Sequence, residues 1–157
     1  MNSMTDNWII PCNIKQFDVI IHFENNSYAI WKNSFSIRKY DIVYIYIGAP
    51  YSEILYKCHV INDAVDDITL KENQYAIPQK ESHNFYSKKT KYIQIQLDSK
   101  YPRGTFPLDK LRENGLGQVQ IQARTDKKLQ NYIDEVNKSA LPALITITQE
   151  GGVLNAD

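Results

Sequence analysis

Cysteine and histidine are scarce in this chain, and their positions argue against the common metal sites. The two cysteines, Cys12 and Cys58, lie far apart, and the three histidines share no short spacing with them or with each other. A structural zinc site needs closely spaced cysteine and histidine ligands. We therefore expect no metal site, and no motif in the sequence indicates a cofactor.

Long hydrophobic runs are absent as well. No apolar run approaches the roughly 18–20 residues that a membrane-spanning helix needs. Residues 1–7 lack the basic start and apolar segment of a secretory signal peptide. These absences predict a cytoplasmic protein with reduced thiols and no membrane partner.

The motifs of the common catalytic classes are also missing. The chain contains no Gly-x-Ser-x-Gly nucleophile elbow and no Gly-x-x-x-x-Gly-Lys-Ser/Thr phosphate loop. Cys58 and His59 are neighbours on an expected strand, where adjacent side chains point to opposite faces and cannot act as a pair. The acidic cluster at 63–72 could hold a metal for a nuclease, but such clusters are usually solvated loops. We expect no catalytic residues and a non-enzymatic protein.

Strand-forming residues dominate what is present. Tyrosine accounts for 11 of the 157 residues and suits half-buried strands and ligand-site walls. Two nearly continuous apolar runs, 42–47 and 54–61, flank a Gly-Ala-Pro turn and predict central strands covered on both faces. The alternating segment 91–97 predicts a further strand that keeps its isoleucines inside and Tyr92 outside.

The remaining segments predict short strands mixed with amphipathic helices. Strands are expected at 8–11, 28–31, 119–123 and 143–148, and helices from Ile14, over 107–114 and after Thr125. Asn13 and Thr125 are typical N-cap residues. Several strands follow one another directly, which predicts an α+β fold around a mixed, strongly curved sheet.

The chain length fits one domain over residues 1–157. Its core is expected at about 8–148, with an insertion or flexible loop at 62–90 and a tail at 149–157.

Charge is balanced overall but not along the chain. Residues 80–128 hold eleven Lys/Arg against five Asp/Glu, a balance of +6. The flank 1–79 holds six against nine and the flank 129–157 holds one against four, so each is −3. A basic middle could form one positive face for phosphates, or it could be ordinary solvated surface.

Three polar or aromatic positions each allow a structural and a functional interpretation. Trp31 ends an expected strand before small polar residues, so it is either core or one wall of a ligand site. Asn13 either caps a helix or presents its amide to a ligand. Arg124 lies between an expected strand and helix, where it is either a surface residue or a phosphate contact.

The order of several segments resembles that of a known family. The matching pieces are Trp8–Asn13, Trp31–Ser34, Asp41–Pro50, Ile54–Cys58 and Leu111–Tyr132. The chain resembles an EVE domain of the PUA-like superfamily, which also holds the YTH and ASCH domains. It is particularly similar to EVE-like modules of modification-dependent restriction systems. The likeness spans roughly residues 8–134.

The resemblance implies a pseudo-barrel of curved sheet with packed helices and a pocket for a flipped, modified base. By resemblance, the pocket residues are Trp31 as a stacking wall, Asn13 and Ser34 as readers of the base edge, and Tyr46 and Tyr51 opposite. Charge and position suggest phosphate contacts at Arg124, Lys32, Lys88, Lys89 and Lys127. The implied partner is nucleic acid with a modified base, DNA in preference to RNA, with a nuclease as partner or fused domain in a defence system.

The chain departs from the family pattern at three places. Asn13-Ile14 replaces a frequent Asn-Pro, and Tyr40 replaces a glycine before Asp41. Because tyrosine is costly at positive φ, a different backbone form is favoured at that turn. Residues 120–122 replace Gln-Gly-Pro, which argues against a close backbone approach to a ligand there. The alternative function is a PUA-like module that binds a small molecule or protein partner and has no nucleic-acid role.

Overall fold

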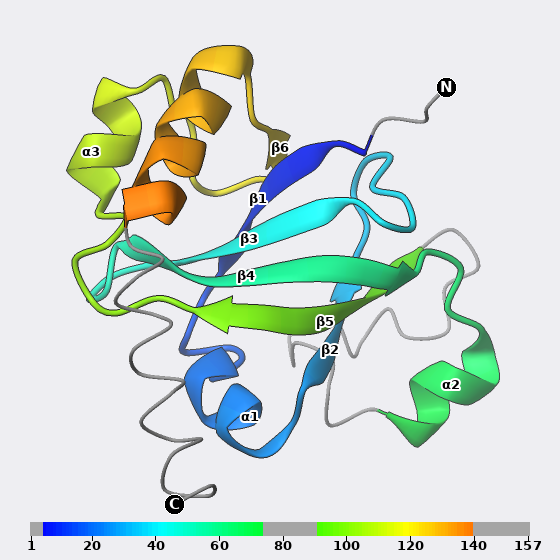
Figure 1. Ribbon diagram of the computed structural model, residues 1–157. Helices are drawn as coiled ribbons and strands as arrows, with labels where there is room; N and C mark the ends of the chain where they lie inside the picture. The colour runs from blue at the N-terminus through cyan, green and yellow to red at the C-terminus, as the bar shows by residue number, and fades with distance from the viewer. Residues whose placement is uncertain (1–4, 74–90, 140–157) are drawn as a thin grey trace, which may run out of the picture.

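A curved mixed sheet forms the centre of the fold, and helices pack on both of its faces (Figure 1). The computed structural model describes residues 5–73 and 91–139. The strands are β1 (Asn7–Cys12), β2 (Tyr28–Lys32), β3 (Ile42–Ile47), β4 (Glu53–Asn62), β5 (Tyr92–Lys100) and β6 (Ala123–Arg124). The helices are α1 (Val19–Asn25), α2 (Asp67–Glu72), α3 (Leu108–Glu113) and a last helix over 127–139.

The strand order is β2-β5-β4-β3-β1-β6. β1 and β3 run parallel, whereas the other neighbouring pairs are antiparallel. The predicted α+β class with a mixed sheet is therefore confirmed. The two edge strands, β2 and β6, do not pair with each other, so the described sheet stays open.

Each face of the sheet has its own apolar core. One core contains Ile10 and Ile45 and is covered by α1. The other contains Ile9 and Tyr44 and is covered by α3 and the 127–139 helix. Neighbouring residues on β1 and β3 thus enter opposite cores, as the side-chain alternation of a strand requires. The prediction that the central strands are covered on both faces is confirmed.

The outward position predicted for Tyr92 is wrong. Tyr92 is buried in a third, smaller cluster with Ile30 and Leu70. Leu70 belongs to α2, which forms within the segment expected to be an insertion or flexible loop. A short helix therefore covers a strand face that an alternating sequence pattern would leave in water.

Three element boundaries differ from the sequence-based predictions. The first helix begins at Val19, where the side chain of Asp18 accepts a hydrogen bond from the Ile21 amide. The last helix is capped by Asp126 rather than Thr125. The predicted strand at 119–123 is wrong, because only Ala123 and Arg124 pair with β1. The predicted strand at 143–148 and the tail lie outside the described residues.

The turn before β3 keeps an unusual backbone despite the tyrosine. Tyr40 has a φ of 78°, so the expectation of a different backbone form there is wrong. The amide of Tyr40 donates to the Val60 carbonyl at 2.9 Å, and the amide of Val60 donates to the Asp41 carbonyl at 2.9 Å. These bonds hold the turn against a strain of roughly 1–2 kcal/mol.

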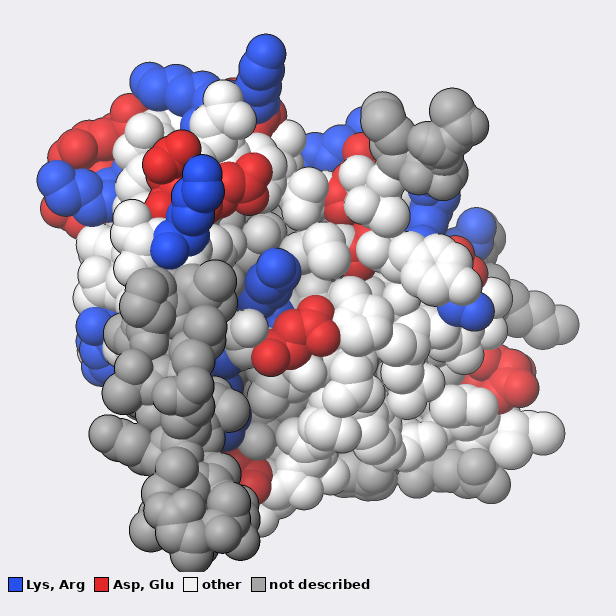
Figure 2. Space-filling model, in the orientation of Figure 1, with Lys and Arg blue, Asp and Glu red and all other residues white. Residues whose placement is uncertain are grey.

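Charged residues do not gather into a single basic area on the face drawn in Figure 2. That view shows Lys/Arg and Asp/Glu intermingled where Figure 1 places α3 and the 127–139 helix. Several residues of the basic middle pair with acids: Arg103 with Glu53, Lys110 with Glu113, and Arg124 with Asp6. Within the described ranges no helix is long and apolar enough to cross a membrane.

Candidate functional site

A pocket of about 260 Å³ opens near the ends of β1 and β2. Its size is just below the roughly 300–1,000 Å³ of drug-sized ligand sites, so it suits a small group. Three segments far apart in sequence build it. Its lining residues are Pro11, Cys12, Asn13, Gln16, Phe17, Trp31, Lys32, Ser34, Phe35, Gln120, Ile121 and Gln122.

Aromatic rings form the inner part of the pocket. Trp31 is 6% exposed and meets the edge of Phe17, with ring centroids 5.6 Å apart and an interplanar angle of 78°. Within residues 5–73 and 91–139, no group accepts a hydrogen bond from the indole Nε1 of Trp31, and this nitrogen is not among the fully buried polar atoms. Trp31 therefore brings an aromatic surface to the pocket.

Amide and hydroxyl groups lie at the pocket mouth. The Oδ1 of Asn13 accepts the Lys15 amide at 3.0 Å, and this bond fixes the side chain. Its Nδ2 donates to none of the described residues and remains available. Ser34 is exposed beside it. The structure thus brings Asn13, Trp31 and Ser34, three of the predicted pocket residues, to one pocket.

Gln122 connects the two edges of the open sheet. Its Nε2 donates to the Lys32 carbonyl at 2.6 Å, and its Oε1 accepts the Ser34 amide at 2.9 Å. The side-chain amide of Gln122 therefore bonds to the backbone of the β2 end in the way that a neighbouring strand would. The bonded residues are 88 to 90 positions apart in the sequence. This buried side chain fixes the segment 120–122 against the end of β2 and so shapes the pocket wall.

Tyr46 and Tyr51, the other two predicted pocket residues, do not line this pocket. Tyr46 is buried in the second core and lines an adjoining hollow of about 740 Å³, which also contains Lys15 and Ser52. Tyr51 lines neither space and stacks under the guanidinium of Arg103, 4.8 Å from its ring centroid. The hollow and the pocket share Asn13, so the two spaces adjoin.

The predicted phosphate contacts are dispersed. Lys32 lines the pocket, whereas Lys127 lies exposed at the start of the last helix. The guanidinium of Arg124 lies 4.9 Å from the centre of the Trp8 ring and donates to Ser36 at 3.2 Å. Lys88 and Lys89 lie outside the described residues.

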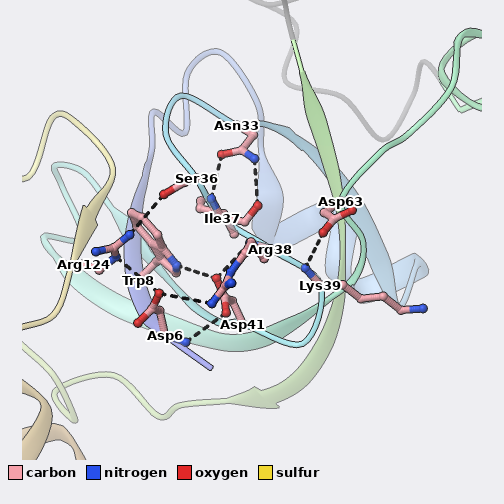
Figure 3. A network of polar contacts seen from close by, with 10 residues as sticks. All are labelled: Asp6, Trp8, Asn33, Ser36, Ile37, Arg38, Lys39, Asp41, Asp63 and Arg124. Atoms are coloured by element: carbon pink, nitrogen blue, oxygen red, sulfur yellow. Dashed lines mark hydrogen bonds and ion pairs between the residues drawn. The ribbon is translucent and has the colours of Figure 1, made fainter. Parts of the chain in front are cut away.

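A polar network fixes the loop between β2 and β3 (Figure 3). The carboxylate of Asp41, only 1% exposed, accepts the Asp6 amide at 3.0 Å and the Arg38 amide at 2.9 Å. It also accepts the indole Nε1 of Trp8 at 2.9 Å. Further along, the side chain of Asn33 bonds to the backbone of Ile37. The loop that carries Ser34 is therefore held by the fold.

The cysteines are buried and the acidic cluster is engaged in the fold. Burial raises the pKa of the Cys12 thiol to about 12 and the pKa of Cys58 well above its usual value. The acidic cluster has local structural contacts: Asp63 accepts the Lys39 amide and Asp66 caps α2. Among the described residues, no group of three His, Cys, Asp or Glu side chains could hold a metal ion.

Several pocket residues carried no recognisable signal in the sequence. Phe17 and Gln16 were expected in a helix that starts five residues too early. Phe35 sits in a segment without periodicity, and Ile121 was expected in a strand over 119–123. Gln122 occupies a position where the family pattern has a different residue type. That departure was the one sequence signal that set this residue apart. The segment 120–122 lines the pocket, and the expectation that its backbone does not closely approach a ligand stays a prediction.

Comparisons with known proteins identify the fold. No protein-family model matches the chain, and no curated protein matches it either. The ASCH protein of Zymomonas mobilis is similar, with a TM-score of 0.58 and 12% identity over 83% of this chain and 94% of that one. A hypothetical protein of Leishmania major has a TM-score of 0.57 and 12% identity over 88% and 98%. Human THYN1, in complex with 5-methylcytosine containing DNA, has a TM-score of 0.53 and 13% identity over 82% and 95%.

These likenesses confirm the predicted PUA-like fold. The chain shares the mixed sheet and packed helices of the ASCH and THYN1 structures, and the resemblance extends over most of the chain. The expectation of a pseudo-barrel needs one refinement, since the described sheet is not closed. Gln122 spans its two edges with side-chain bonds only.

Proposed function

We propose that this protein is a non-enzymatic module that binds nucleic acid by taking one modified base, such as a methylated cytosine or adenine, into the pocket at Trp31. The observation that carries the proposal is a pocket of about 260 Å³ that is lined by a buried tryptophan and by the exposed amide of Asn13. No Asp or Glu is found among the described residues that line it, and Lys32 is present, so the surroundings favour an anionic ligand.

The chemistry of a flipped base matches these groups. Stacking on an aromatic side chain contributes about 1–3 kcal/mol per base, which offsets much of the cost of leaving the helix stack. The amide of Asn13 offers a donor to the base edge. A methyl group buried against an apolar wall adds about 0.8 kcal/mol, a plausible source of discrimination.

The comparison with human THYN1 supports DNA as the first ligand to test. That protein shares the fold and is solved with DNA that contains 5-methylcytosine. In this chain, cleavage of a marked DNA would come from a partner or fused nuclease, because the acidic cluster is engaged in local structure. The reader would then supply the specificity of a defence system.

The test is binding by fluorescence anisotropy to matched short duplexes and single strands of DNA and RNA. Each is prepared with and without 5-methylcytosine, 5-hydroxymethylcytosine and N6-methyladenine. We expect one modified member to bind at least about tenfold more tightly, equal to about 1.4 kcal/mol. Its log affinity falls with log salt, because phosphate contacts release counterions.

Trp31→Ala should abolish the preference for the modified member. Because removal of a buried ring also destabilises the core, Asn13→Ala at an exposed position provides a second test of the pocket. Tyr40→Ala, an exposed aromatic outside the pocket, is the matched control. If Trp31→Ala leaves the preference intact, the pocket assignment is wrong. Absence of binding to every member would favour the small-molecule or protein-binding alternative.

A further inference from the structure

Two large apolar side chains flank the pocket mouth and remain half exposed. Phe35 is 53% exposed and Ile121 is 51% exposed, yet both line the pocket. They come from opposite edges of the open sheet, Phe35 after β2 and Ile121 before β6. Apolar groups left in water at a binding site indicate contacts with a ligand that extends beyond the pocket.

The backbone around both side chains is fixed. On the Phe35 side, the Ser34 amide donates to Gln122 at 2.9 Å and the Phe35 amide donates to Asn33 at 3.3 Å. Ile121 directly precedes Gln122, whose amide bonds to the end of β2. The ring of Phe35 lies nearly parallel to that of Trp8, at 17° and 6.5 Å. A fixed backbone limits the conformational entropy that the two segments lose when they meet a ligand.

We infer that the ligand is double-stranded and that Phe35 and Ile121 form an apolar wedge that enters the base stack beside the extracted base. The inference rests on the proposed function and adds to it the form of nucleic acid. The wedge has its own physical role, because a base that leaves a duplex exposes the faces of its stacked neighbours. Apolar side chains inserted between base steps cover such faces in other DNA-binding proteins.

The wedge should contribute much less to the binding of a single strand. Its bases can unstack without breaking pairs, so pocket binding requires no filling of a continuous stack. The pocket at Trp31 should therefore accept a base from either form, whereas the rim should matter chiefly for the duplex. This difference separates the wedge from the pocket in one experiment.

The experiment compares the affinity of wild type, Phe35→Ala, Ile121→Ala and the double variant for two probes. One is a short DNA duplex with a central 5-methylcytosine·guanine pair, and the other is its methylated single strand. We expect the double variant to lose about tenfold or more in duplex affinity and less than about twofold in single-strand affinity. Phe35→Leu should retain most of the duplex affinity, and Tyr40→Ala serves as the exposed-aromatic control.

Base extraction is followed on the same duplex with 2-aminopurine next to the methylated base. Its fluorescence should rise when wild type binds and rise much less with the double variant. Equal losses on both probes would overturn the wedge and make the rim an ordinary pocket wall, and no loss on either would overturn it as well. A wild type that binds neither probe, nor any other member of the panel, would overturn the proposed function and the wedge with it.

Discussion

The two tryptophans are buried to nearly the same degree but have different surroundings. Trp8 is 3% exposed and Trp31 is 6% exposed, and both belong to the same core. The indole Nε1 of Trp8 donates to Asp41, and the guanidinium of Arg124 covers its ring. Trp31 has only the edge of Phe17 as its ring partner among the described residues, and no described group accepts from its Nε1.

This comparison shows that two equally buried indoles can differ in how the fold satisfies them. A buried indole nitrogen normally has a hydrogen-bond partner, because leaving it unpaired is costly. Trp8 satisfies that expectation within the fold. The Nε1 of Trp31 has no acceptor among the described residues, and because it is not fully buried it does not carry that cost within the fold.

Replacement of Asp41 should have the largest effect and tests the structural half of the comparison. Its carboxylate accepts two backbone amides and the Trp8 indole at 2.9–3.0 Å. Asp41→Ala leaves these donors without their partner, so we expect the free energy of unfolding to fall by about 3 kcal/mol. Urea unfolding measures this loss.

Binding by the folded fraction of Asp41→Ala should fall much less than that of Trp31→Ala, because Asp41 does not line the pocket and acts on it only through the loop that carries Ser34. Ile42→Val, a conservative change on the same strand, is the control for small perturbations of β3. A variant as stable as wild type would show that the Trp8 network contributes little to the fold.

Exchanging each tryptophan for phenylalanine compares the two sites directly. Trp8→Phe removes the donor to the buried carboxylate and should lower the free energy of unfolding by about 2 kcal/mol, with a smaller effect on binding than Trp31→Phe has. Trp31→Phe keeps an aromatic ring in the core and should cost about 1 kcal/mol in stability. It should weaken binding about fivefold, since it loses the larger stacking face.

Thermal or urea unfolding and anisotropy on the same preparations give both quantities. The comparison between the two sites breaks down if Trp8→Phe impairs binding as much as Trp31→Phe does. It would also break down if Trp31→Phe were the more destabilising of the two.

The sequence predicts the sheet better than it predicts the pocket. Continuous apolar runs locate β3 and β4 because both faces of these strands are buried. The position of Trp31 at a strand end also follows from local pattern. The role of Gln122 does not, because it depends on how the sheet curves and brings segments 88 to 90 residues apart into contact.

Caps and exposure are equally difficult to predict from local pattern. Asn13 is a residue type that often caps helices. Here its side chain bonds within a single turn, and Asp18 caps the helix. Both residues satisfy the same chemical rule, and only the packing of Val19 and Phe23 decides where the helix begins. The half-exposure of Phe35 and Ile121 likewise follows from the fold, so no sequence pattern could separate them from core residues.

The smallest expected effect concerns pH and the region next to Trp31. Burial lowers the pKa of His22, whose Nε2 lies 2.7 Å from the Tyr28 carbonyl oxygen and whose ring lies 5.2 Å from that of Phe17. The folded state therefore binds a proton less readily than the unfolded state. Stability is complete above the usual histidine pKa of about 6.5 and falls as the pH drops toward the lower folded value.

Urea unfolding between pH 7.5 and pH 5, a range of roughly one unit or more on each side of that pKa, measures the slope. His22→Gln should remove the part of the slope that His22 contributes. His59→Gln, on β4 and outside the pocket lining, is the control. Because Phe17 joins His22 to Trp31, protonation should also weaken ligand binding in wild type more than in His22→Gln. A slope that is the same in both proteins would show that His22 does not link the pocket to pH.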